Sequence, residues 1–244
     1  MEAANTIRTA VARVGELREA QAARAGLREA VIVVKVLQAR RFEGTYADLL
    51  AHGPYSAAAK FFLEELYSER DFAERDAQFA RIAGAIERFF PSAVAQTAVD
   101  LARLHALTES LDHAMGQAWL DGGGKDDAAR YVEAWRTVGR RAEREAQLAD
   151  VLSIGREMAR LTRAPGLRTM LRMMRAPAYA AGLASLQGFL ESGFDTFSAM
   201  ARGDGARSFL GIIKDRESNL IADLFDEPVV ACGTRLAALL GQAP

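Results

Sequence analysis

Cysteine and histidine are both scarce in this sequence. Of its 244 residues, one is cysteine, Cys232, and three are histidine. A lone cysteine cannot form an internal disulfide, which is typical of proteins in a reducing cytoplasm, and one cysteine with scattered histidines cannot build a zinc cluster. Cys232 follows the apolar residues Val229, Val230 and Ala231 and has no histidine near it in sequence. We therefore predict that it is a small core residue and not a catalytic thiol.

Net charge and long apolar runs are also lacking. The 31 basic residues are balanced by 32 acidic ones, and the formal net charge is −1. This balance excludes a globally basic nucleic-acid binder and a polyacidic tail protein. The longest uncharged stretch, residues 176–190, is shorter than the roughly 20 apolar residues that a bilayer span needs. The N-terminal residues lack the apolar run of a signal peptide, so we expect a cytoplasmic protein without a transmembrane segment.

No internal repeat, linker-like change of composition or convincing pair of strands interrupts the chain. Apolar residues recur instead at spacings of three and four, which predicts helices throughout. The β-branched run at 31–37 is interpreted as helix too, because a lone strand would leave its backbone groups without partners. We predict an all-α fold, a single-domain antiparallel helical bundle of eight or nine helices over residues 1–244.

Several long helices organise the predicted bundle, one of which begins at Ser92. An N-terminal helix over 6–41 would be on the order of 50 Å long if unbroken, so we expect a kink near Gly26 or a protruding end that could mediate dimerisation. Residues 126–162 are predicted to form a second long helix. The helix over 178–200 is nearly all apolar or small, which is typical of a central, covered helix. A short terminal segment over 227–244 completes the chain.

One sequence motif resembles a known family. The run Phe-Phe-Leu-Glu-Glu-Leu-Tyr at 61–67, followed by Arg-Asp-Phe at 70–72, resembles an uncharacterised bacterial family named for its FFLEELY motif. Residues 107–112, 134–140 and 188–194 are similar to other segments of that family. The resemblance covers nearly the whole chain and implies a bacterial origin and a helical single domain. It implies no activity, cofactor or catalytic residue.

A polar stripe crosses the apolar face of the helix that begins at Ser92. On a helical wheel Asp112 lies within about 20° of Leu101 and His105 within about 40°, with Glu109 beside them. A carboxylate one or two turns from an imidazole can orient it, raise its basicity or share a metal ion with it. The simpler interpretation is a histidine that is hydrogen-bonded to a carboxylate at the edge of the core.

Glutamates also fall inside apolar faces on two other helices. Glu217 lies near the centre of the apolar face of the C-terminal helix, and Glu65 lies between Phe61 and Phe62 on its own helix. An unpaired buried carboxylate costs several kcal/mol, so Glu217 needs a partner or a raised pKa. It either pairs with an arginine from another helix, the simpler interpretation, or acts as an acid, base or ligand in a cavity. The candidate catalytic residues are therefore His105, Glu109, Asp112, Glu217 and Glu65.

The common metal and phosphate motifs are absent. A di-metal carboxylate site in a helical bundle needs Glu-x-x-His on two helices, but the residues three positions before the histidines are Leu49, Ala102 and Ser110. For a metal site of another geometry, His105 and Glu109 are the candidate ligands. The Gly-Gly-Lys at 123–125 lacks the spacing and the preceding strand of a phosphate-binding loop. We therefore predict no cofactor.

A basic segment departs from the balanced charge. Residues 158–190 contain five arginines and no acidic residue. Arg168, Arg172 and Arg175 share one face of a short predicted helix, with Met170 and Met174 on the opposite side. These arginines could form a solvated face above a methionine-filled core, with their charge neutralised by acids of neighbouring helices. Alternatively, the segment docks a protein partner or an anionic, amphipathic ligand such as a lipid headgroup.

These patterns favour a non-enzymatic binding or scaffold protein that contacts a partner or an anionic, amphipathic ligand through residues 158–190. Nucleic acid is not expected as a partner, because no aromatic residues alternate with the arginines. Peripheral membrane contact and a homodimer are both compatible with the sequence. The alternative is an enzyme or metal-binding protein with a His/carboxylate site between helices.

Overall fold

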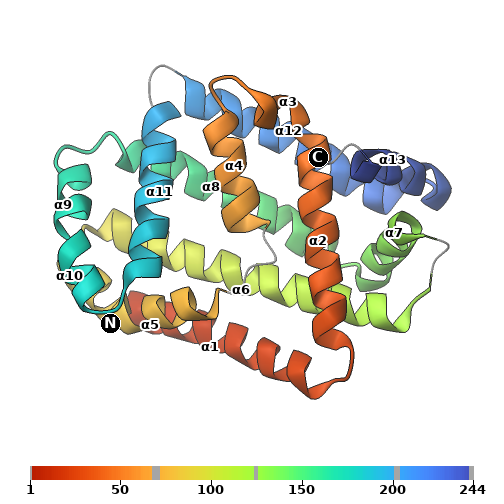
Figure 1. Ribbon diagram of the computed structural model, residues 1–244, viewed down its shortest axis with the longest axis horizontal. Helices are drawn as coiled ribbons and strands as arrows, with labels where there is room; N and C mark the ends of the chain where they lie inside the picture. The colour runs from red at the N-terminus through yellow and green to blue at the C-terminus, as the bar shows by residue number, and fades with distance from the viewer. Residues whose placement is uncertain (1, 68–71, 124–125, 201–203, 242–244) are drawn as a thin grey trace. The chain divides into compact units, whose positions relative to one another are not determined.

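The chain is almost entirely helical. The computed structural model describes residues 2–67, 72–123, 126–200 and 204–241, and every regular element in these ranges is an α-helix, which confirms the predicted fold class (Figure 1). The helices are α1 (Glu2–Ala23), α2 (Leu27–Thr45), α3 (Ala47–Ala51), α4 (Ser56–Leu66), α5 (Ala73–Phe89), α6 (Ser92–Asp121), α7 (Asp127–Val138), α8 (Arg141–Leu161), α9 (Leu167–Met173), α10 (Arg175–Ala180), α11 (Ala184–Met200), α12 (Gly205–Asp226) and α13 (Val229–Gly241). In the described ranges no helix combines the length and the apolar character that a bilayer span requires.

The helices outnumber the eight or nine predicted, because long predicted helices are divided. The predicted helix over 6–41 is divided at Gly26, the position of the expected kink: α1 ends at Ala23, α2 begins at Leu27, and α2 continues to Thr45. Gly26 has a φ of 77°, a conformation that residues with a side chain rarely adopt. The predicted helix over 126–162 is likewise divided into α7 and α8, where both Gly139 and Arg140 have a positive φ.

The helix predicted over 178–200 forms only from residue 184 onward, as α11, and the prediction is wrong at its N-terminal end. The chain turns at Gly182, so that α10 ends at Ala180 and α11 begins at Ala184. In α10 only Ala178 is buried. Residues 178–182 are alanine and glycine apart from Tyr179, and such small residues tolerate exposure because each presents little apolar surface to water.

The chain forms two compact units, each assembled from three separate segments. The first unit consists of Met1–Gly15, Arg70–Ala106 and Asp150–Leu210, and the second of Glu16–Glu69, Leu107–Ala149 and Gly211–Pro244. The long helix α6 contributes to both. No linker-like composition marks the points where the chain passes from one unit to the other, so the prediction of a single domain over 1–244 stays a prediction.

The core of the first unit is built from small side chains. Parts of α1, α5 and α6 contribute a buried cluster in which alanine predominates: Ala4, Ile7, Ala10, Ala83, Ile86, Ala95, Ala98, Val99 and Ala102. Small residues at these positions let helix backbones approach closely.

The core of the second unit contains larger side chains, including Leu37, Met115, Trp119, Trp135 and Leu224. Helix α13 packs against both α2 and α7 (Figure 1). It carries Cys232, which is buried in this core, and burial raises the pKa of the Cys232 thiol. The predicted structural role of Cys232 is therefore confirmed.

Candidate functional site

A group of connected polar side chains in the second unit surrounds Glu217. Glu217 on α12 accepts a hydrogen bond from Arg41 Nη1 of α2 at 2.6 Å and one from the Tyr46 hydroxyl at 2.9 Å, both on its Oε1. The Tyr67 hydroxyl lies 3.5 Å from the second oxygen, Oε2. Phe42 packs against both phenol rings, with centroid distances of 4.4 Å to Tyr46 and 4.6 Å to Tyr67. Glu217 therefore has the arginine partner that the simpler interpretation required.

Burial and charge shift the pKa values of Arg41, Tyr46 and Tyr67. Burial, together with the nearby Glu217 carboxylate, raises the pKa of both Tyr46 and Tyr67, so the phenols stay protonated and act as donors. Burial by itself would lower the pKa of Arg41, but Glu217 and the surrounding phenols raise it overall. A permanently charged arginine thus faces a carboxylate whose oxygens are already engaged, an arrangement that favours a structural role over proton transfer.

A second set of polar contacts joins α2 to α6. Lys35 Nζ donates to Glu109 Oε1 at 2.6 Å, and Gln38 Nε2 donates to Asp112 Oδ1 at 3.0 Å. Together with Arg41, these α2 side chains recur every third residue. We call the three α2 residues and their acidic partners Glu109, Asp112 and Glu217 the polar seam. The sequence carried a signal for it, since three long polar side chains interrupt the apolar run of α2 at regular spacing.

Asp112 and Arg144 are the least compensated charges near the seam. Burial raises the pKa of Asp112, although Lys35 and Arg144 act in the opposite direction. Burial also lowers the pKa of Arg144, whose guanidinium carbon lies 4.1 Å from the centroid of the Trp135 ring. Within the described residues, neither Arg144 Nη2 nor Trp135 Nε1 has a hydrogen-bond partner. The indole face stabilises the Arg144 cation in place of a carboxylate.

The structure gives the residues of the predicted stripe, His105, Glu109 and Asp112, different hydrogen-bond partners. His105 Nε2 lies 3.0 Å from Asp76 Oδ2 on α5, in the first unit, whereas Glu109 and Asp112 belong to the second unit and pair with α2. Glu65 on α4 is only partly buried. Among the described residues, no group of three or more His, Cys, Asp or Glu side chains could hold a metal ion.

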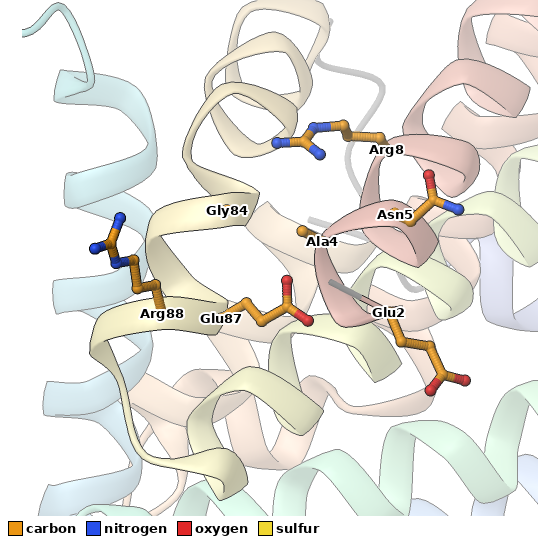
Figure 2. A pocket seen from close by; sticks show the side chains of 7 residues that line it. All are labelled: Glu2, Ala4, Asn5, Arg8, Gly84, Glu87 and Arg88. Atoms are coloured by element: carbon orange, nitrogen blue, oxygen red, sulfur yellow. The ribbon is translucent and has the colours of Figure 1, made fainter.

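An open groove between α1 and α5 in the first unit has no counterpart in the sequence predictions (Figure 2). Figure 2 shows Arg8 extending from α1 toward Gly84 of α5, and Glu87 pointing from α5 toward α1. Glu87 Oε1 accepts a hydrogen bond from the Ala3 backbone N–H at 3.3 Å. Both signs of charge line the groove, and Glu87 already contacts α1, so the groove presents no concentrated charge to a ligand.

The predicted basic segment contains α9 and α10 of the first unit. Arg168 Nη2 donates to Asp195 Oδ1 at 2.7 Å, and Arg175 Nε donates to Glu191 Oε1 at 3.0 Å. Both acids lie on α11. Gln187, which is buried on α11, donates to the Leu171 carbonyl and to Glu191. Two of the three predicted arginines are thus held by acids of a neighbouring helix, as the solvated-face interpretation expected.

The methionines of this segment do not form a filled core. Met170 is partly buried, but Met173 is 73% exposed and Met174 is 42% exposed. Tyr179 on α10 is 58% exposed as well, and no residue of α9 is buried. The helical wheel placed Met170 and Met174 opposite the arginines but gave no reason to single out Met173 or Tyr179.

Comparison with known proteins gives a family and no activity. No curated protein and no solved structure matches the chain. A family model described as "Domain of unknown function (DUF8198)" matches residues 17–229, which is most of the chain. The expectation of an uncharacterised family, drawn from the resemblance to FFLEELY proteins, agrees with this match. The chain belongs to the family of the domain of unknown function DUF8198.

Proposed function

We propose that this chain is a non-enzymatic protein-binding module of a bacterial cytoplasm. Its binding surface consists of the exposed side chains of α9 and α10, Arg168, Arg172, Met173, Met174, Arg175 and Tyr179, which we call the Arg/Met surface. The observation that carries the proposal is the exposure of Met173, Met174 and Tyr179 within one stretch of seven residues. Large apolar side chains gathered among arginines on a surface are typical of a contact with another molecule.

The composition of the surface favours a protein over a lipid or nucleic-acid partner. Tyrosine, methionine and arginine are enriched at the centres of protein interfaces, whereas lysine is depleted, and this surface contains no lysine. Arg168 and Arg175 already pair with Asp195 and Glu191, which leaves little positive charge for phosphates. The matching partner is an amphipathic segment whose apolar side chains cover the methionines and whose carboxylates reach Arg172.

The low burial of α9 supports the same proposal. Isolated helices shorter than about 12–15 residues are marginal in water, and helices in proteins depend mainly on packing of an apolar face. Helix α9 has seven residues and none of them is buried. Its polar contacts with α11 include the pair between Arg168 and Asp195 and the hydrogen bond from Gln187 Nε2 to the Leu171 carbonyl. A partner that covers Met173 and Met174 would supply the missing apolar packing.

Site-directed photo-cross-linking in the native cells tests the proposal. A photoreactive phenylalanine derivative replaces Met173, and a matched probe replaces Val230 on α13, which is 82% exposed and lies outside the Arg/Met surface. We expect a discrete protein adduct at position 173 that is absent at position 230. The further change Arg172→Glu in the 173 probe should reduce the yield of that adduct several-fold, because it repels the partner's carboxylates.

Two outcomes would contradict the proposal. One is the same adduct pattern, or none, at positions 173 and 230. The other is strong sedimentation of the purified protein with vesicles of phosphatidylcholine and about 30% phosphatidylglycerol that is lost on Met173→Asp, since anionic lipid would then be the ligand of this surface.

A further inference from the structure

The outward face of α2, in the second unit, is apolar although it is not covered. Leu27, Ala30, Val31, Val34 and Leu37 form its buried face. On the opposite side Ile32 is 42% exposed and Val33 is 38% exposed, and Val36 and Ala39 are partly exposed. β-Branched residues are weaker helix formers than alanine or leucine, so water-facing positions gain nothing from them unless another surface covers them.

Charged residues of opposite sign end this apolar stripe. Glu29 precedes Ile32 and Val33 by about one turn, Arg40 follows Val36 by about one turn, and both are exposed. They are 11 residues apart, which is about 16 Å along the helix, so they cannot pair with each other within one chain. Glu29 makes no ion pair with any residue that the structure describes. We call Glu29, Ile32, Val33, Val36, Ala39 and Arg40 the α2 stripe.

The α2 stripe is complementary to itself when one copy is reversed. We propose that two copies of this chain associate through their α2 stripes, as an antiparallel helix pair with a two-fold axis near the peptide between Val34 and Lys35. Val33 then lies opposite Val36 of the second copy, and Glu29 lies opposite Arg40 of the second copy. The two-fold symmetry repeats each of these contacts, so two valine pairs are flanked by two ion pairs.

The charges of the α2 stripe favour this register over shifted registers and over a parallel pair. A two-fold axis at Val36 would place Glu29 opposite Glu43 of the second copy, and a parallel pair would place Glu29 opposite Glu29. Like charges at such positions oppose association, whereas the proposed register pairs opposite ones. The α2 stripe thus determines the partner, its direction and its register.

The expected dimer is weak. A stable interface buries roughly 800 Å² on each partner, and a single helix with four small or medium apolar side chains provides less. Self-association should therefore depend on concentration in the micromolar range or above. Sedimentation equilibrium of the purified full chain, from about 1 to 500 µM, measures it.

The first test places a charge in the middle of the stripe. Val36→Glu puts carboxylates against the opposing valine and should weaken self-association at least about tenfold. The same change at the exposed Val230, Val230→Glu, is the matched control and should leave the dissociation constant unchanged. Circular dichroism verifies that both variants keep the native helix content.

The second test exchanges the charges. Glu29→Arg alone and Arg40→Glu alone each create two like-charge contacts and should each weaken the homodimer about tenfold. A mixture of the two single variants should associate as well as the native protein. In the mixed dimer the arginine introduced at position 29 of one chain faces the glutamate introduced at position 40 of the other, and the native Arg40 and Glu29 also pair. Arg40 donates a hydrogen bond to the Leu240 carbonyl as well, and its loss is common to the single variant and the mixture.

The results separate this proposal from others. Recovery of association in the mixture, and in the double variant Glu29→Arg/Arg40→Glu, supports an antiparallel pair in this register. A native protein that is monomeric at every concentration overturns the proposal, and so does a dimer that is insensitive to Val36→Glu. If the mixture associates no better than the single variants do, the proposed register, with Glu29 opposite Arg40 of the second copy, is overturned.

Discussion

Glu217 illustrates how a carboxylate is tolerated in the interior of this protein. Arg41→Met would leave the buried Glu217 carboxylate without its arginine partner, and Glu217→Gln would leave the buried Arg41 charge unpaired. Each variant should therefore lower the free energy of unfolding by about 3–5 kcal/mol. The double variant Arg41→Met/Glu217→Gln removes both charges, while the side-chain carbonyl introduced at position 217 can still accept from Tyr46. It should cost only about 1–2 kcal/mol, and denaturant unfolding measures all three free energies. Additive losses would show that the pair is not coupled.

The buried Asp112 carboxylate should destabilise the folded protein at neutral pH, and this penalty should decrease as the pH falls. Burial raises its pKa above the ordinary value of 3.8, so the folded protein binds this proton more tightly than the unfolded chain does. The group therefore opposes folding at neutral pH, and the penalty is relieved as the pH falls through the raised folded pKa toward 3.8. Lys35, Glu109 and Arg144 face it and set the size of the effect. We expect Asp112→Asn to be at least as stable as the native protein at pH 7, with a difference that shrinks on acidification.

Asp48 provides the control with the opposite sign. Hydrogen bonds from Arg216 at 2.7 and 2.8 Å lower the pKa of Asp48. Its contribution is present above the ordinary pKa and is lost as the pH falls through the depressed folded value. Asp48→Asn should therefore lose a little stability at pH 7, and the loss should vanish at low pH. Unfolding curves of both variants between pH 3 and pH 7 test this pair of trends, and parallel trends would contradict it.

At the scale of the element, the contact between α2 and α13 depends on Gly44. A β-carbon at this position would lie 2.2 Å from the Leu239 carbonyl oxygen, and backbone cannot move aside without shifting a helix. Gly44→Ala should therefore destabilise the protein by about 1–3 kcal/mol. Gly211 on α12 has no atom within 4 Å of such a carbon, so Gly211→Ala should be neutral or stabilise by about 0.5–1 kcal/mol. The thermal unfolding temperature should fall for Gly44→Ala and should stay unchanged or rise for Gly211→Ala.

At the scale of the whole molecule, the segments of the two units alternate along the chain. A cut at Ala149 leaves residues 1–149 without α12 and α13, and removes Ile221, Leu224, Cys232, Leu236 and Leu240 from the core of the second unit. The same cut removes Asp150–Leu210 from the first unit. We expect fragment 1–149 to lack a cooperative thermal transition and a dispersed amide NMR spectrum. A native-like spectrum from the fragment would contradict the division.

The sequence predicted best where the signal is local. Apolar spacing predicted a helix that begins at Ser92, where α6 begins, because an amphipathic helix has the same period wherever it packs. The break at Gly26 could be foreseen from the length of the helix and the glycine in it. The turn at Gly182 could not, since the apolar residues around it continue the helical pattern on both sides.

The candidate site residues show the same difference between features that a single helix determines and features that depend on its neighbours. The sequence by itself determined that Glu217, Glu109 and Asp112 lie on or beside the apolar faces of their helices, and all three are buried. Only the tertiary structure decided which side chains hydrogen-bond to these carboxylates. Their partners Arg41, Lys35 and Gln38 come from a helix 70 or more residues away in the chain. It also decided that Met173 and Tyr179 are exposed. Partner choice and exposure depend on which helix faces meet in three dimensions, and the periodicity of a single helix carries no information about its neighbours.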